Sequence, residues 1–298
     1  ISLSTTFAQD ELRLGPGKLF LGARFDMYRR FSDGVESRLS PRIAYVQDFS
    51  PSTTGKLIYG EAYRAPTVSE SRYQDGLPAA STIWANPALR PELSKSLEAM
   101  LTHESQPGVQ WRLSTFLKRL ADSPVQVVTP ELNGIPCGLG PNGCIQYRNS
   151  GLTQQVAGIE ADVKVKQFDR GSFYASMVLQ KGTQAGQELT SSPRRQFKAG
   201  ISRELPWPNM NAALEAHYIG SVLGRIDANG SGTHIVPAYV LVNANINAGR
   251  PSGGWQASLH VNNLLNRAIY TVASRELQPL ERVPADGRRY SLQLQLDF

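Results

Sequence analysis

The feature that most constrains this chain is a repeated alternation of apolar and polar residues. Within residues 158–166, one set of alternate positions is apolar and the other is ionisable: Ile159, Ala161, Val163 and Val165 oppose Glu160, Asp162, Lys164 and Lys166. Successive side chains of a β-strand point to opposite faces, so this period indicates a strand with two different faces. Four ionisable side chains cannot line a dry core, so one face must meet water or polar partners.

The same alternation predicts about 13 strands, each near or above the roughly 9 to 11 residues that a tilted membrane strand needs. They are expected at residues 3–14, 17–29, 37–49, 54–65, 92–105, 109–127, 145–167, 171–182, 194–204, 209–221, 237–248, 254–266 and 287–298.

The connections between these strands alternate between short and long. Short turns fall at residues 15–17, 50–53, 105–108, 169–171, 206–209 and 249–253, and longer loops at 31–36, 65–91, 128–145, 182–193, 223–236 and 267–286. All short turns then lie at one end of the strands and all long loops at the other, which is typical of an outer-membrane barrel with short periplasmic turns and long extracellular loops. We therefore expect an all-β fold, an antiparallel transmembrane β-barrel. An odd strand count predicts at least one further strand before residue 1.

Composition agrees with this fold class and excludes others. Hydrophobic residues make up 41% of the 298, which is too many for a disordered chain. The longest run of hydrophobic residues, 238–242, is far shorter than a membrane helix requires. The net charge of +6 is spread without a block of like charges, so we expect no nucleic-acid partner. The four histidines have no zinc-ligand spacing and no hydrolase motif is present, so we expect neither a metal site nor an enzyme.

The last strand and four internal motifs resemble a known family. Alternate apolar residues lead to a terminal aromatic in Tyr290, Leu292, Leu294, Leu296 and Phe298, as in the strand by which outer-membrane proteins are recognised by the barrel assembly machinery. Residues 59–70 (YGEAYRAPTVSE), 86–92 (NPALRPE), and 147–151 with 158–160 (YRNSG, GIE) resemble signatures of TonB-dependent outer-membrane receptors, as does 261–266 (VNNLLN). These motifs occur in family order across nearly the whole chain.

The resemblance implies an architecture larger than this chain. Such receptors have a barrel of about 22 strands filled by an N-terminal plug. Residues 1–298 show about 13 strands, no plug and no TonB-contacting box, so we expect them to be the C-terminal part of a receptor barrel. Inward-facing charges of mixed sign, among them Arg24, Asp26 and Asp162, are expected to hold a plug or solvate a lumen.

The resemblance also implies a function in the bacterial outer membrane. Such a receptor binds a scarce nutrient at its extracellular loops, commonly a ferric siderophore or similar metal chelate and in some cases a cobalamin. The TonB complex, acting through the N-terminal region, then moves the plug. The expected partners are membrane lipid, the TonB complex, the assembly machinery and the small-molecule chelate. A passive porin is the main alternative, and a soluble all-β binding protein is a third.

Aromatic and arginine residues near the strand ends and in the long loops are the candidate ligand-binding set. An anionic iron chelate would pair with guanidinium groups and stack on aromatic rings. An interfacial aromatic girdle is the alternative interpretation of the rings. The set comprises Tyr63, Arg64, Arg72, Tyr73, Trp84, Tyr147, Arg148 and Tyr270.

Two loop segments suggest further local chemistry. Cys137 and Cys144 lie close together in a segment rich in Gly and Pro, which favours a loop disulfide in an oxidising compartment. Asp227, Asn229 and Ser231 resemble the first half of a calcium loop, but Ala238 stands where the bidentate Glu is required. We therefore expect no resident cofactor.

Overall fold

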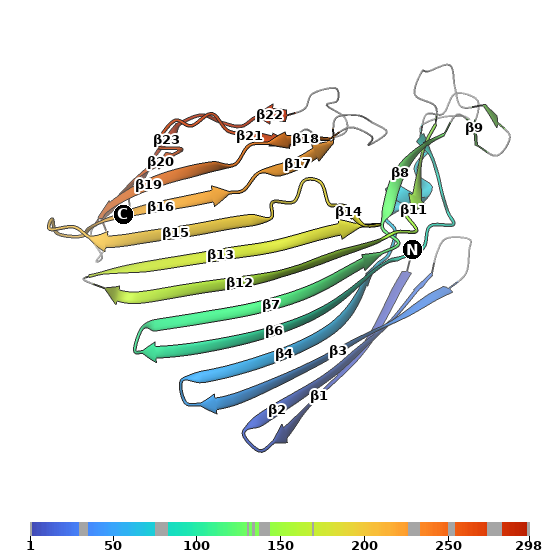
Figure 1. Cartoon of the computed structure of the whole chain (residues 1–298), viewed down its shortest axis with the longest axis horizontal. Helices are drawn as coiled ribbons and strands as arrows, with labels where there is room; N and C mark the ends of the chain where they lie inside the picture. Colours follow the sequence, from blue (N-terminus) through green and yellow to red (C-terminus); the bar gives the residue numbers. More distant parts are fainter. Residues whose placement is uncertain are drawn as a thin grey trace.

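The main structure is one curved antiparallel sheet whose strands follow one another in chain order (Figure 1). The computed structural model describes the chain except residues 1, 30–34, 75–82, 130, 133–134, 137–143, 169, 226–232, 250–253, 273–281 and 297–298. Along the sheet lie β1 (Ser2–Leu14), β2 (Gly17–Arg29), β3 (Val35–Ser50), β4 (Thr53–Arg64), β6 (Glu92–Gln106), β7 (Val109–Ala121), β12 (Thr153–Phe168), β13 (Gly171–Gln184), β15 (Arg195–Glu204), β16 (Met210–Ile219), β19 (Tyr239–Gly249), β20 (Trp255–Asn262) and β23 (Arg289–Leu296).

The strands of the sheet confirm the prediction made from the alternation of apolar and polar residues. Each predicted strand corresponds to one strand of this path, and each pairs with its chain neighbour in the path. A short strand, β14 (Gln187–Glu188), pairs with β13 beside the path. The two edges of the ordered path are β1 and β23.

Two predicted strands, 109–127 and 145–167, are wrong in extent because each contains a break. Asp122 has a left-handed backbone conformation with φ of 58°, and Gly151 likewise with φ of 64°. A strand cannot continue through such a residue, so the chain leaves the main sheet after β7 and rejoins it at β12. The detached pieces, β8 (Pro124–Thr129) and β11 (Cys144–Asn149), form a separate sheet with β5 (Ile83–Trp84).

The long loops also contain small elements that the alternation did not predict. They are helix α1 (Val68–Arg72) and the pairs β9 (Glu131–Leu132) with β10 (Ile135–Pro136), β17 (Val222–Arg225) with β18 (Thr233–Val236), and β21 (Tyr270–Val272) with β22 (Arg282–Pro284). All of them lie at the long-loop end of the sheet (Figure 1). Among the described residues no helix is long and apolar enough to cross a membrane.

The two faces of the sheet differ as the alternation predicts. Leu57, Leu97 and Leu113 lie on the apolar face and are 45–51% exposed. We call this the outward face, because a membrane barrel presents its apolar face to lipid. Asp26, Asp162 and Glu215 lie on the opposite, inward face. The fully buried apolar residues, such as Leu89 and Cys144, instead lie among the loops at the long-loop end of the sheet.

Candidate functional site

A pocket of about 330 Å³ lies where the strands β1, β2 and β4 meet helix α1 at the long-loop end of the sheet. Three of the predicted ligand-binding residues, Tyr63, Arg64 and Arg72, line it together. Tyr28, which the sequence analysis missed, stacks on Tyr63 with 6.1 Å between the ring centroids and 18° between the ring planes. The other lining residues are Leu3, Arg24, Ala65, Pro66, Ser71 and Pro87.

A buried carboxylate positions one of the pocket's cations. Asp26 is completely inaccessible to solvent. It accepts hydrogen bonds from Thr5 Oγ1 at 2.6 Å and from Arg24 Nε at 2.7 Å. Because Asp26 satisfies only one edge of the guanidinium, the Arg24 side chain stays 55% exposed beside the tyrosine pair. The alternation placed Arg24 and Asp26 correctly on the inward face, but did not indicate that they border a pocket.

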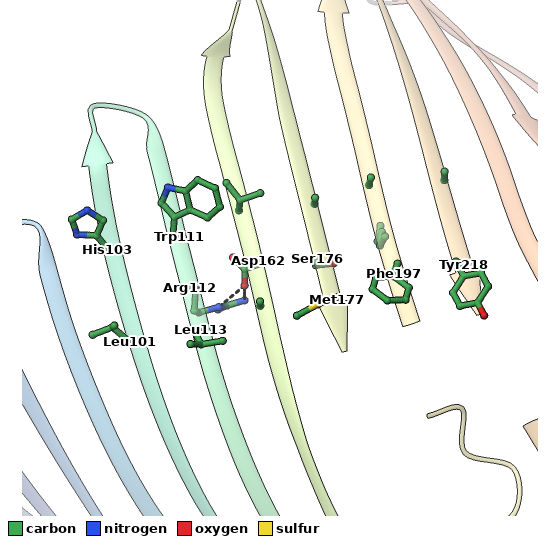
Figure 2. A pocket seen from close by; sticks show the side chains of 16 residues that line it. Leu101, His103, Trp111, Arg112, Leu113, Asp162, Ser176, Met177, Phe197 and Tyr218 are labelled. Atoms are coloured by element: carbon green, nitrogen blue, oxygen red, sulfur yellow. Dashed lines mark hydrogen bonds and ion pairs between the residues drawn. The ribbon is translucent and has the colours of Figure 1, made fainter. Parts of the chain in front are cut away.

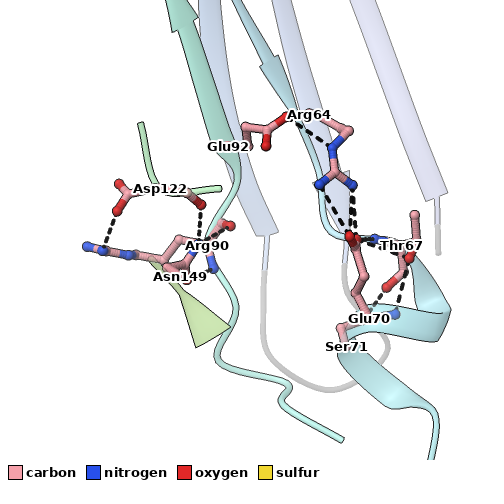
Figure 3. A network of polar contacts seen from close by, with 8 residues as sticks. All are labelled: Arg64, Thr67, Glu70, Ser71, Arg90, Glu92, Asp122 and Asn149. Atoms are coloured by element: carbon pink, nitrogen blue, oxygen red, sulfur yellow. Dashed lines mark hydrogen bonds and ion pairs between the residues drawn. The ribbon is translucent and has the colours of Figure 1, made fainter. Parts of the chain in front are cut away.

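Arg64 is engaged by two carboxylates (Figure 3). Its Nη1 lies 3.0 Å from Glu70 Oε2 and its Nη2 lies 3.2 Å from Glu70 Oε1, a two-pronged contact. Its Nε donates to Glu92 Oε1 at 3.2 Å. Glu92 is the residue opposite Arg64 on the neighbouring strand β6. These contacts join Arg64 of β4 to helix α1 and to β6.

Glu70 also completes the N-terminal cap of helix α1. The Thr67 hydroxyl accepts the Glu70 backbone N–H at 3.1 Å, and Glu70 Oε2 accepts the Thr67 N–H at 2.8 Å, which together form a capping box. Burial raises the pKa of the Glu70 carboxyl, but the hydrogen bonds from Arg64 and Thr67 outweigh it, so this pKa lies below its usual value. We call Arg64, Thr67, Glu70 and Glu92 the Arg64 latch.

Trp84, Tyr147 and Arg148 lie in the small sheet formed by β5, β11 and β8, away from the pocket lining. Trp84 is only 7% exposed, so it packs within this region. Arg148 Nε donates to Gln146 Oε1 at 2.9 Å, and the Tyr147 hydroxyl accepts from Gln126 Nε2 at the same distance. Tyr147 and Arg148 are consecutive in a strand, so their side chains point to opposite faces.

Amide side chains join the loop after β4 to the loop after β7. Asn86 Nδ2 donates to the Tyr147 carbonyl oxygen at 2.7 Å. Asn149 Oδ1 accepts the Arg90 N–H at 2.8 Å, and its Nδ2 donates to the carbonyl oxygens of Arg90 at 2.9 Å and Asp122 at 2.7 Å (Figure 3). The two loops are therefore one connected unit above β6 and β7.

The bonds of Asn149 predict the effect of an isosteric substitution. In Asn149→Asp a carboxylate oxygen would face the two carbonyl oxygens that Nδ2 now satisfies, so we expect the loop unit to be destabilised by about 1–3 kcal/mol. Hydrogen exchange of residues 83–91 and 144–150 in the full-length protein measures this effect. Arg90→Ala is the control, because it keeps the backbone bonds and loses only an exposed ion pair to Asp122. Equal exchange in both variants would contradict this role of Asn149.

The remaining predicted residues do not converge on the pocket. Tyr73 follows α1 and is 51% exposed. Tyr270 lies in the β21–β22 hairpin, well away from β8 and β11 (Figure 1), with the Arg282 guanidinium 4.2 Å above its ring. Cys144 is buried and disulfide-bonded. Cys137 and the calcium-loop residues Asp227, Asn229 and Ser231 lie outside the described residues, so these interpretations stay predictions.

Comparison with known proteins decides the family. Residues 1–264 match the family described as "TonB dependent receptor-like, beta-barrel". The chain belongs to this family. It is therefore a bacterial outer-membrane protein of the TonB-dependent receptor class, as its motifs indicated.

The curated relatives and the solved structures agree with this assignment. The chain is 25% identical over 303 residues to the iron-regulated outer membrane virulence protein of two Vibrio cholerae strains, matching 98% of this chain and 44% of the relative. The chain thus spans less than half the length of these relatives. Similar folds include the Pseudomonas aeruginosa ferripyoverdine receptor (TM-score 0.75, 16% identity, 99% of this chain and 38% of that one) and ferric enterobactin receptor (0.74, 17%, 99% and 45%). A copper transporter also has this fold (0.73, 14%, 99% and 48%).

These matches bear on the alternatives left open by the sequence. The family comprises receptors and transporters rather than enzymes, and a passive porin finds no support among the matches. Among the described residues, no group of three or more His, Cys, Asp or Glu side chains is arranged to hold a metal ion.

Proposed function

We propose that this protein is part of a receptor that takes up a ferric siderophore or a similar metal chelate across the outer membrane, with energy from the TonB complex. The observation that carries this proposal is the pocket at the extracellular end. It combines a stacked tyrosine pair, Tyr28 and Tyr63, with the guanidinium groups of Arg24 and Arg72. Aromatic faces and guanidinium groups suit a large planar anion. The iron-regulated Vibrio relative supports iron as the nutrient.

The proposal also covers how the barrel is assembled in the membrane and how its sheet is closed. Tyr290, Leu292, Leu294 and Leu296 are 61–69% exposed along β23, as an edge strand read by the assembly machinery requires. Phe298 lies outside the described residues. The open edges at β1 and β23 are consistent with closure by further strands of a barrel of about 22.

An uptake assay tests the proposed function. A strain lacking the gene is complemented with the full-length gene, or with Tyr63→Ala or Arg72→Gln variants, and is given ⁵⁵Fe in spent medium from iron-starved cultures. We expect each variant to take up iron about tenfold more slowly, because a stacking ring or a cation of the pocket is lost. Arg148→Gln is the control, since Arg148 lies outside the pocket lining.

Three results would overturn the proposal, and two of them would indicate a different function. Iron uptake that is unchanged by loss of the gene excludes iron chelates as the cargo. Loss of ⁵⁷Co-cyanocobalamin uptake instead would assign a cobalamin. Uptake that persists in a strain without TonB would favour a passive pore.

A further inference from the structure

The outward face of six consecutive strands carries cations but no acids. In β6, β7, β12, β13, β15 and β16 every Asp and Glu occupies an inward position, including Glu98, Glu160, Asp162 and Glu215. The alternation alone predicts an apolar outward face, which would exclude charges of both signs. On these strands only negative charge is excluded from the outward face. This asymmetry of sign indicates an electrostatic role.

Three outward cations form a row at the extracellular ends of their strands. Arg119 is near the end of β7, Lys181 is near the end of β13, and Arg195 begins β15. Arg195 lies opposite Leu179, two residues before Lys181, so these two cations are close neighbours on one face. We call these three residues the basic row. None of them forms an ion pair with another residue of the described chain, whereas Lys95, opposite Arg119, contacts Glu61 at 2.9 Å.

On the periplasmic side of the basic row, the outward face is hollowed into an apolar groove of about 570 Å³ (Figure 2). Its floor contains Ala175, Ala199 and Ala216, which are register partners on β13, β15 and β16. The next register row toward the extracellular end contributes the bulky wall residues Met177, Phe197 and Tyr218. The row on the periplasmic side contains Phe173, Ile201 and Leu214. Small residues between two bulky rows therefore produce the groove.

The distance between the basic row and the groove matches the distance between the headgroup of a lipid and its acyl chain. Arg195 and Ala199 are four residues apart on one strand, as are Lys181 and Met177, which corresponds to about 13 Å at the rise of a β-strand. A headgroup at the basic row would thus place an acyl chain over the groove. Unpaired Arg and Lys side chains at a membrane surface attract anionic headgroups, and guanidinium groups bind phosphate with two hydrogen bonds.

We propose that this surface binds a phosphate-bearing lipid of the extracellular leaflet, with its phosphates at Arg119, Lys181 and Arg195 and one acyl chain in the alanine-floored groove. The charge row favours this occupant over a second copy of the chain, because two identical basic rows would repel each other. It also favours an anionic lipid over a zwitterionic one.

Lipid retention by the purified full-length receptor tests the proposal. The receptor in detergent is incubated with lipid A, which carries two phosphates, or with dipalmitoyl phosphatidylethanolamine, and bound lipid is counted by native mass spectrometry. We expect wild type to retain lipid A preferentially. The variant R119Q/K181Q/R195Q should bind lipid A about tenfold more weakly or worse, and the difference should shrink in high salt.

Matched variants separate binding from folding and from total charge. Lys164→Gln with Lys166→Gln removes inward cations of β12 and should leave retention unchanged. Ala199→Phe fills the groove and should weaken retention, whereas Ala212→Phe, an outward residue of β16 outside the groove, should not. Heat-modifiable gel mobility verifies that each variant is folded. Equal retention by wild type and the triple variant, or equal retention of the two lipids by wild type, would overturn the proposal.

Discussion

Replacing Ile159 with Arg should destabilise the full-length receptor by about 2–4 kcal/mol. Ile159 lies midway along β12 on the outward face and is 46% exposed. A cation at the middle of the bilayer costs about this much because its charge loses hydration. Urea unfolding in phospholipid vesicles, followed by tryptophan fluorescence, measures the change.

The control for this prediction is an equivalent substitution on the inward face. Val178 lies opposite Glu160 on β13 and is an apolar, β-branched residue like Ile159. In Val178→Arg the new cation faces the lumen and can pair with Glu160, so the free energy of unfolding should change by less than about 1 kcal/mol. A similar loss in both variants would show that the assignment of the two faces is wrong.

Replacing Arg64 with Ala should release helix α1 from the barrel wall. Arg64 joins Glu70 of α1 to Glu92 of β6, and nearly half of its side chain is exposed, so we expect a loss of about 1–2 kcal/mol. Hydrogen exchange at Ser71, whose N–H donates to the Thr67 carbonyl oxygen, should therefore become about tenfold faster.

Arg148→Ala is the matched control for the latch, because Arg148 bonds to Gln146 in the small sheet and, within the described part of the chain, forms no hydrogen bond or ion pair with α1. In Arg148→Ala, the hydrogen-exchange rate of the Ser71 N–H should equal that of wild type. If Arg64→Ala also leaves Ser71 exchange unchanged, the capping box alone holds α1, and Arg64 would return to the candidate ligand-binding set.

The same latch should depend on pH in a defined direction. The folded-state pKa of Glu70 is depressed, because its bonds to Arg64 and Thr67 outweigh its burial. A depressed carboxyl pKa contributes stability above the ordinary Glu value of about 4.3, and that stability is lost as pH falls through the folded-state pKa. Ser71 protection, corrected for intrinsic exchange, should therefore be constant from neutral pH to about 5 and decline below about 4. A decline near neutral pH would contradict this assignment.

The strands and their faces were predictable because they depend on local geometry. Alternation in β12 placed Ile159 outward and Glu160 inward, and register with β7 and β13 preserves this arrangement. The two errors of extent, at Asp122 and Gly151, arose at single residues with left-handed backbone conformations. Asp is one of the few non-glycine residues that tolerate that conformation, but a period of two carries no signal for it, so the alternation continued across Asp122 undetected.

The candidate site was predictable only in part. Tyr63, Arg64 and Arg72 do converge, because a short segment joins the end of β4 to α1. The role of Arg64 was not visible, since its partner Glu92 is 28 residues away. Trp84 was proposed as a ligand contact, yet it is buried through the pairing of β5 with β11, about 60 residues further along the chain.

The sequence by itself determined the strand order, the apolar and polar faces, the family and the end of the barrel that carries the long loops. Each of these follows from a period of two residues, from turn length or from short motifs, which are properties of neighbouring residues. Only the tertiary structure decided which arginines are held by carboxylates, which aromatic rings pack out of reach, and that Tyr28, Tyr63, Arg24 and Arg72 border one pocket. Those contacts join strands and loops that are distant in sequence, and they depend on sheet register and strand curvature rather than on residue pattern.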